Sequence, residues 1–477
     1  MFQGIILKGS FCLNKDSIML NLWEKVVDDD KLHRNFTVIS SGDFNQAERE
    51  LLSQWSEGFV DRDGKFVKEF QQTFDSSFWE LYLHRAFLEL GFQHCYNHPA
   101  PDFLLKKGES EIVAEATTAL NPDGFRPEHE NDIEKPRPLE DIVDLSCIRL
   151  LNSISQKGQK YLDSYRNLSH VQDQPFLICV APMEQPQTYS QNQEAIRRVL
   201  YGLGKPVAIK DRSGALIQVG QEFVPTIKKA SGTSLDLGYF LNPENSHVSG
   251  VLFTTCATFS KVRALSERKD DPAIFMSVRY NVGGSEPIVS EAKKEDYSES
   301  VVDGLNLYLN PFADHPLDLN LFNDEDIVVS EFDPRTSELL VHVHSSALIQ
   351  RMCLTFRKFE DKEELKVIAS EKSDFKPMAP LDKIDFADGH LHRLEAETDL
   401  ADEHYLSHYM GGSILIIRDR IDREWAGIAI PGEFRTIHDF VASRPLVNPK
   451  DDVQLGFFDS KEEAFKAVKK RVDHILD

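Results

Sequence analysis

The pattern of apolar and polar positions predicts a helix followed by strands in the first third of the chain. Over residues 77–90, apolar side chains recur at i, i+3 and i+4, which predicts a helix, and Gly91 follows where a C-terminal cap is expected. The segments 92–98, 101–107 and 111–119 then predict three strands in a meander or hairpin.

A second helix and a buried strand are predicted further along the chain. Residues 141–166 have a helical pattern, and the nearly continuous apolar run 175–183 is typical of a strand that is buried on both faces. Residues 189–202 predict another helix, and 248–259 another buried strand. The order helix, three strands, helix, strand indicates an α/β or α+β fold.

The chain length and the distribution of turn residues suggest three regions. A chain of 477 residues is long enough for two or three domains. Residues 1–73 form a polar, partly helical lead-in, and 74–315 hold the predicted helices and strands described above. Turn residues are concentrated near 312–325, and the strand-like runs and helices that follow predict a C-terminal α+β domain over 316–477.

The charge of the chain limits the partners it can have. The formal net charge is −24, with 54 basic and 78 acidic side chains. Proteins that coat nucleic acid or bind anionic membranes are usually basic, because phosphate attracts Lys and Arg. The charge therefore argues against both classes, but it leaves room for an enzyme with a small basic groove.

Cysteine usage and hydropathy favour a soluble, cytoplasmic protein. The six cysteines are scattered without a CxxC pair, which indicates neither a zinc ribbon nor a disulfide framework and fits a reducing compartment. No apolar run approaches the roughly 18 residues of a membrane span, so no membrane partner is expected.

Two carboxylates give the strongest chemical signal in the sequence. Asp102 begins one predicted strand, and Glu115 lies in the next, on the same strand face as Val113 and Thr117. A hairpin would bring Asp102 and Glu115 together, where two carboxylates repel each other unless a positive group joins them. A divalent metal such as Mg²⁺ is a natural partner for such a pair.

This arrangement resembles the PD-(D/E)XK nuclease superfamily over roughly residues 74–183. Pro101-Asp102 matches the PD dipeptide, Glu115-Ala116-Thr117 takes the place of the (D/E)XK element, and Glu80 lies on the preceding helix, where the family often has a glutamate. The resemblance implies a restriction-endonuclease-like core, with a central mixed sheet flanked by helices, to which the C-terminal domain is added.

The chain departs from the family pattern at the lysine position. Thr117 stands where the family has a lysine, and a threonine carries no positive charge. Some families move this lysine to the following helix, where the chain offers Lys157 and Lys160, of which Lys160 is the preferred candidate. Either a relocated lysine replaces the missing group, or the site is degraded.

The resemblance implies hydrolysis of phosphodiester bonds with Mg²⁺ or Mn²⁺ as the cofactor. Asp102, Glu115 and the Ala116 carbonyl would hold the metal, Glu80 could hold a second metal through water, and Lys160 would steer the nucleophile or the phosphate. DNA is the expected nucleic acid, and defence against foreign DNA is the expected role. The alternative is an inactive nuclease-fold protein that binds nucleic acid or a protein partner; a homo-oligomer also stays open.

Simpler structural roles compete with these assignments. Ser77 and Glu80 have the spacing of a capping box, so Glu80 would then only bond the start of its helix. Asp102 can be a turn residue at the start of a strand, and lysines on a helix, such as Lys157 and Lys160, are usually solvated. Glu115 is harder to explain in this way, because an unpaired carboxylate in an apolar strand is costly.

A locally basic stretch runs from residue 195 to 229. Its positive charge in an acidic chain predicts a phosphate-facing wall, with a solvated helix face as the alternative. The predicted nucleic-acid-binding residues are Arg197, Arg198, Lys205, Lys210 and Arg212.

Overall fold

The computed structural model divides the protein into two compact units. The first unit contains the described residues up to Cys353, and the second contains those from Leu354 onward. The structure describes residues 19–42, 44–121, 139–185, 188–210, 216–229, 231–268, 273–284, 287–354, 392–394, 401–409, 412–419, 425–431 and 460–466.

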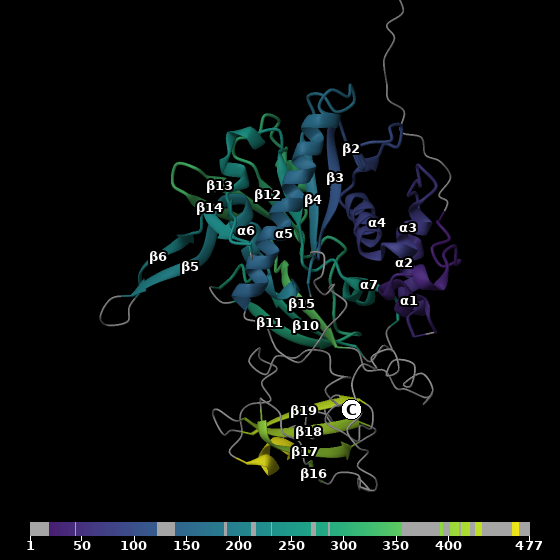
Figure 1. Cartoon of the computed structure of the whole chain (residues 1–477), viewed down its shortest axis with the longest axis vertical. Coiled ribbons are helices and arrows are strands. Elements are labelled where there is room, and N and C mark those ends of the chain that lie inside the picture. Colours follow the sequence, from purple (N-terminus) through teal and green to yellow (C-terminus); the bar gives the residue numbers. More distant parts are fainter. Residues whose placement is uncertain are drawn as a thin grey trace, which may run out of the picture. The chain divides into compact units, whose positions relative to one another are not determined.

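An eight-stranded mixed sheet forms the centre of the first unit (Figure 1). Its order is β1-β2-β3-β4-β9-β12-β13-β14. The pairs β3–β4, β4–β9 and β12–β13 are parallel, and the remaining pairs are antiparallel. The strands are β1 (Gln93–His94), β2 (Phe103–Lys107), β3 (Ser110–Leu120), β4 (Phe176–Met183), β9 (Gly250–Phe253), β12 (Asn306–Leu309), β13 (Val328–Asp333) and β14 (Glu338–His342).

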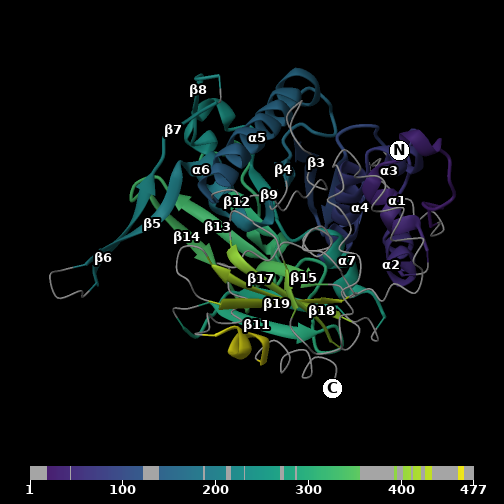
Figure 2. The same cartoon turned by 60° about the horizontal axis from the view of Figure 1, so that its bottom comes forward.

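Helices cover both faces of this sheet, as Figures 1 and 2 show from two directions. Cys179 of β4 packs into the core on the side of the N-terminal helices, whereas its neighbours Ile178 and Val180 pack into the core on the opposite side. One face carries α1 (Arg34–Ser40), α2 (Gln46–Trp55), α3 (Phe66–Gln72) and α4 (Phe74–Glu89), and the other carries α5 (Leu139–Lys160) and α6 (Glu194–Tyr201). The central strand β4 is therefore buried on both faces, as its apolar run predicts.

The architecture agrees with the predicted mixed α/β fold, a large mixed sheet flanked by helices. Helix α4 begins at Phe74, three residues before the predicted start, and Gly91 follows it with a φ of +79°, the left-handed conformation that a glycine cap allows. The predicted helix over 141–166 ends as α5 at Lys160 and continues as one π-helical turn, Tyr161–Tyr165. The predicted strand 248–259 is confined to β9, because a turn and α7 (Phe259–Leu265) follow it.

The first unit extends beyond the boundary that the sequence suggests near residue 315. Strands β13 and β14 continue the central sheet, because β13 pairs with β12 in parallel and β14 pairs with β13. Smaller sheets join β5 (Leu203–Lys210) to β6 (Leu216–Phe223), β7 (Thr226–Lys228) to β8 (Ser234–Asp236), and β10 (Ile274–Arg279) to β11 (Ile288–Lys293) and β15 (Leu348–Leu354).

The second unit contains an antiparallel four-stranded sheet. Its strands are β16 (His392–Leu394), β17 (Ala401–Tyr409), β18 (Gly412–Asp419) and β19 (Trp425–Pro431), in that order. A helical segment over 461–466 follows later in the chain. Across both units, none of the helices in the described ranges combines the length and the apolar character needed to cross a bilayer.

Candidate active site

Asp102 and Glu115 meet where β2 and β3 begin to pair. Phe103 is opposite Ala114 in this antiparallel pair, so Asp102 and Glu115 occupy the next position of the register. The Asp102 backbone N–H faces Glu115 Oε2 at 3.4 Å, and the Ala116 N–H donates to Asp102 Oδ2 at 2.9 Å. The hairpin thus holds the two carboxylates side by side, as the strand pattern predicts.

Glu115 is fully buried and contacts two lysines from the neighbouring helix. Its Oε1 atom lies 2.7 Å from Lys157 Nζ and 2.6 Å from Lys160 Nζ. The two lysines are three residues apart, near the end of α5, so both point to the same side of the helix. Both Lys157 and the preferred candidate Lys160 thus reach Glu115 from α5.

The electrostatics of this cluster are set by burial and by opposing charges. Burial disfavours the charged carboxylate of Glu115, but Lys157 and Lys160 outweigh it and lower the pKa. Burial also works against the charge of Lys160, yet the hydrogen bond to Glu115 raises its pKa. Burial and the negative charge of Glu115 raise the pKa of Asp102. Of the two carboxylates, Glu115 is therefore the one whose surroundings favour the charged form.

Glu80 belongs to the same electrostatic cluster. Burial, and next the repulsion by Asp102, raise the pKa of Glu80 to about 8. The alternative of a capping box with Ser77 is wrong, because α4 begins at Phe74 and both residues lie inside the helix. The N-cap is Thr73, whose side chain makes no capping hydrogen bond. Burial and the charge of Asp102 thus outweigh the one cation that lowers the pKa of Glu80, which is Arg62.

Arg62 is a component of the site that the sequence pattern does not reveal. Its guanidinium donates to the backbone carbonyls of His98, Pro101 and Asp102, each at 3.0 Å. It also acts to lower the pKa of Glu80. The residue comes from the N-terminal region, which the sequence suggests is only a lead-in, and no local motif distinguishes it from the other arginines. Arg62 thus fixes the backbone that carries Asp102.

Two histidines from different segments stack beside the backbone that precedes Asp102. The rings of His98 and His170 stack with centroids 3.7 Å apart and an interplanar angle of 7°. His170 donates from Nε2 to the Ala100 carbonyl at 2.8 Å. Burial and the neighbouring His170 lower the pKa of His98. The contact joins the segment before Asp102 to the segment after α5.

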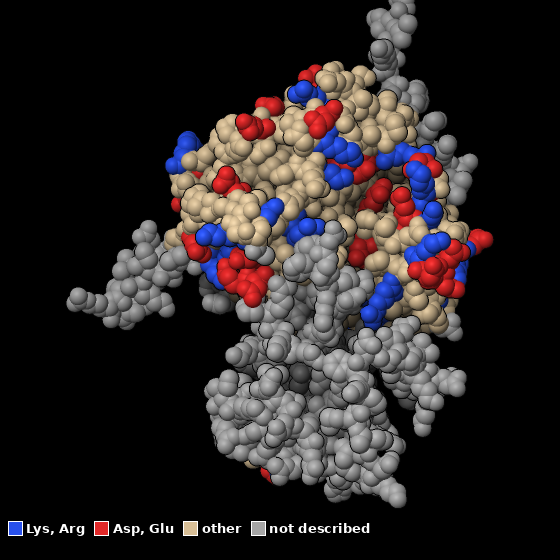
Figure 3. Space-filling view, in the orientation of Figure 1, with Lys and Arg blue, Asp and Glu red and all other residues tan. Residues whose placement is uncertain are grey.

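The surface is hollowed in the region between α5 and α4. Acidic side chains lie within the hollow, and basic side chains lie around it, when the molecule is seen in the orientation of Figure 1 (Figure 3). Lys160 is the more accessible of the two lysines, since 45% of its side chain is exposed against 22% for Lys157. Its ammonium also lies 5.0 Å from the centre of the Tyr165 ring, a cation–π contact.

The basic stretch 195–229 does not join this cluster. Arg198 is buried and pairs with Glu140 and Asp144 in the first turns of α5, and Lys205 also pairs with Glu140. Asp144 and Lys157 are about 20 Å apart along the helix, at 1.5 Å per residue. Arg198 and Lys205 therefore do not form the predicted phosphate-facing wall beside Glu115. Their acidic partners hold them at the other end of α5.

Of the remaining three predicted residues, the structure describes only the side chain of Arg197. Arg197 is largely buried, and its guanidinium donates to Gln193 Oε1 at 2.6 Å. Lys210 is the last residue of β5, and its side chain lies outside the described part of the chain. Arg212 as a whole also lies outside the described residues.

The oxygen atoms of the cluster determine how a cation could bind. Within the ranges that the structure describes, no group of three or more His, Cys, Asp and Glu side chains is placed to hold a metal ion. A cation would therefore be held by Asp102 and Glu115 with main-chain and water oxygens, a ligand set that Mg²⁺ accepts. Comparison with known proteins adds no assignment, since no family model, curated protein or solved structure matches the chain.

Proposed function

We propose that the protein is a divalent-metal-dependent nuclease with a restriction-endonuclease-like core, and that it hydrolyses the phosphodiester bonds of DNA. The single observation that carries the proposal is the cluster of Asp102, Glu115, Lys157 and Lys160. It combines two adjacent carboxylates on paired strands with ammonium groups, which are the residue types of metal-assisted phosphodiester hydrolysis. Defence against foreign DNA is the role proposed with it, on the resemblance to a superfamily of restriction enzymes.

The proposal assigns the missing lysine to α5. Lys160 is partly exposed and lies 2.6 Å from Glu115, so its ammonium can orient either a water molecule or a phosphate oxygen beside the carboxylates. Lys157 is more buried and acts mainly to keep Glu115 ionised. Thr117 then needs no catalytic role.

The oxygen atoms fit a hard divalent cation. Asp102 uses Oδ2 to accept the Ala116 N–H, and no described residue hydrogen-bonds to its Oδ1. Asp102, Glu115 and the Ala116 carbonyl would hold Mg²⁺ or Mn²⁺, and Glu80 would bind a second ion through water. Burial and the charge of Asp102 raise the pKa of Glu80, and a nearby cation would favour its charged form. Such a cation lowers the pKa of bound water and neutralises phosphate charge.

The net charge constrains how DNA would approach. With −24 on the chain, the general surface repels the phosphate backbone. The substrate is therefore expected to contact the protein around Lys157, Lys160 and Arg62, where the local positive charge lies. Because so few basic side chains would contact the DNA, its affinity for the protein should be weak and should depend on the divalent metal ion.

The experiment is cleavage of plasmid, linear DNA and RNA by the full chain with Mg²⁺ or Mn²⁺. Asp102→Asn and Glu115→Gln should each lower the rate by at least about a hundredfold, the usual scale for losing a metal ligand or its neighbour. Glu111→Ala is the matched control, because Glu111 is an exposed carboxylate on the same strand. If both site variants cut as fast as the parent chain, the assignment fails.

A second candidate is an inactive nuclease-fold protein that binds nucleic acid or a protein partner. The two lysines on Glu115 Oε1 favour it, since they neutralise the carboxylate without a metal. Calorimetry with Mn²⁺ separates the two candidates. Binding that is lost in Asp102→Asn and accompanied by cleavage supports the nuclease, whereas DNA binding without Mn²⁺ binding or cleavage supports the inactive protein.

A further inference from the structure

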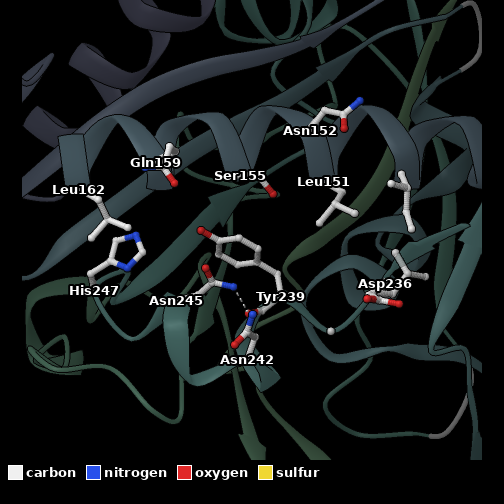
Figure 4. Close-up of a pocket in the computed structure, with 13 residues that line it drawn as sticks. Leu151, Asn152, Ser155, Gln159, Leu162, Asp236, Tyr239, Asn242, Asn245 and His247 are labelled. Carbon is white, nitrogen blue, oxygen red and sulfur yellow. Dashed lines mark hydrogen bonds between the residues drawn. The ribbon is translucent and has the colours of Figure 1, made fainter. Parts of the chain in front are cut away.

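A cavity lies on the side of α5 that faces away from Glu115. It has a volume of about 380 Å³ and is bounded by α5 and by the segment 235–247 (Figure 4). Ser155 and Lys157 are two residues apart on the helix and therefore point about 200° apart. The cavity is thus separate from the cluster at Glu115, although α5 forms a wall of both.

Tyr239 supplies an unused hydroxyl to this cavity. Tyr239 is 8% exposed, and its hydroxyl makes no hydrogen bond to any described residue. In Figure 4 the hydroxyl points across the cavity toward α5. A Cβ at Gly158 would lie 2.2 Å from this oxygen, so only glycine lets the ring approach the helix so closely. A hydroxyl that no described residue binds is available to a ligand, which can replace the water that solvates it.

The wall formed by α5 offers further polar groups. Ser155 and Asn152 make no side-chain hydrogen bond to the described residues. Gln159 donates from Nε2 to Asp163, which leaves its Oε1 as an acceptor. Figure 4 shows the Ser155 hydroxyl directed toward the ring of Tyr239.

The opposite wall is also rich in acceptors. Asn245 donates from Nδ2 to the Tyr239 carbonyl, which leaves its Oδ1 as an acceptor. The carboxylate of Asp236 makes no hydrogen bond to the described residues, and it lies at the same cavity. These acceptors call for a ligand that donates several hydrogen bonds.

The lining also excludes some ligand classes. No Lys or Arg is among the thirteen lining residues, so nothing here would neutralise a phosphate. Leu151, Leu162, Leu235 and Leu237 add apolar surface against which the flat face of a ring can pack.

We propose that this cavity binds a neutral polyhydroxylated ring. Its hydroxyls would donate to Asp236, Gln159 and Asn245 and pair with the hydroxyls of Tyr239 and Ser155. A free saccharide and the ribose of a nucleoside share this chemistry. The site is independent of the nuclease proposal, and its test needs no cleavage assay.

The test is saturation-transfer-difference NMR on the full chain with maltose, adenosine and 2′,3′-dideoxyadenosine. Ligand is added up to about 10 mM, enough to saturate a site whose Kd is near 1 mM. We expect saturable binding of maltose or of adenosine, and the one that binds identifies the source of the ring. We expect no binding of the dideoxynucleoside, which keeps the base and the 5′-hydroxyl but lacks both hydroxyls on the ribose ring.

Variants locate the binding. Tyr239→Phe removes only the unpartnered hydroxyl, and Ser155→Leu fills the cavity, so each should weaken binding at least fivefold. Tyr161→Phe is the matched control, because Tyr161 lies on the next turn of the same helical segment but does not line the cavity. The proposal is overturned if neither polyol binds, if the dideoxynucleoside binds equally well, or if binding is unchanged in both Tyr239→Phe and a folded Ser155→Leu.

Discussion

The ammonium of Lys160 lies 2.6 Å from Oε1 of Glu115, a carboxylate with no exposed surface. Lys157 reaches the same oxygen at 2.7 Å. A buried carboxylate is stable as an ion only with such partners, so this contact is important both for the fold and for the proposed chemistry.

Removal of both lysines should destabilise the protein. The double variant Lys157→Met/Lys160→Met leaves Glu115 buried without a cation, which should lower the free energy of unfolding by about 3–5 kcal/mol. Addition of Glu115→Gln to the double variant should restore most of that loss, because it removes the unpaired charge. Urea denaturation in EDTA measures both effects.

The matched control for this prediction is Lys106→Met. Lys106 pairs with Glu111 at the surface, so its loss should cost less than about 1 kcal/mol. A double variant as stable as the parent chain would show that Glu115 does not depend on its two lysines.

Arg62→Gln should weaken the site without touching a carboxylate. The variant removes three hydrogen bonds to the backbone around Asp102, so the carboxylate loses its fixed position. If the chain is a nuclease, the Mn²⁺ concentration for half-maximal cleavage should rise about tenfold or more, as is usual for groups that orient a metal ligand.

Arg85→Gln is the control for this change. Arg85 pairs with Glu89 on the exposed side of α4, so its loss should leave the Mn²⁺ dependence unchanged. An equal shift in both variants would indicate a general loss of stability instead of a positioning role for Arg62.

Glu80→Gln should alter the pH dependence of stability in metal-free buffer. The folded pKa of Glu80 is about 8, against 4.5 for the ordinary side chain. Between these values the folded chain keeps a proton that the unfolded chain releases, so stability falls as the pH rises toward 8. Glutamine has no such proton, so the variant should match the parent at pH 4 and exceed it at pH 9 by on the order of 2–4 kcal/mol. Equal stabilities at pH 9 would contradict the raised pKa.

His94→Phe should reduce the sensitivity to acid. Burial lowers the pKa of His94 to about 3, and of His84, which it contacts, to about 4. Below pH 6.5 the two histidines bind protons in the unfolded chain but stay neutral in the folded chain. The free energy of unfolding therefore falls as the pH drops toward 4. The drop in Tm between pH 7 and pH 5 should therefore be smaller in the variant. His344→Asn, at an exposed position, should leave the drop as it is in the parent chain.

Gly158→Ala should destabilise α5, although alanine normally favours a helix by about 1 kcal/mol. The new Cβ would meet the Tyr239 hydroxyl at 2.2 Å, and such overpacking costs about 1–3 kcal/mol. Addition of Tyr239→Phe removes the atom that clashes and should recover part of the loss, which denaturant unfolding measures. A more stable Gly158→Ala single variant would contradict the close approach.

The sequence by itself determined the local arrangement around the two carboxylates. The alternation of side chains in a strand places Glu115 on the same face as Val113, and the short turn before β3 places Asp102 opposite it. The apolar run of β4 likewise predicts burial on both faces. These features depend on neighbours close in the chain, so periodicity and turn length are sufficient to predict them.

Only the tertiary structure decided which charges join the carboxylates. Lys157 and Lys160 are 42 and 45 residues from Glu115, and they reach it because α5 packs against β3. Arg62 lies between two of the N-terminal helices and reaches the backbone at Asp102. Arg198 pairs with Asp144, near the other end of α5. A sequence shows that a side chain is charged, but packing decides which opposite charge lies within 4 Å and how much water remains around it. The local charge of the basic stretch therefore did not predict the acidic partners of Arg198, whereas the strand pattern did predict that Asp102 and Glu115 are neighbours.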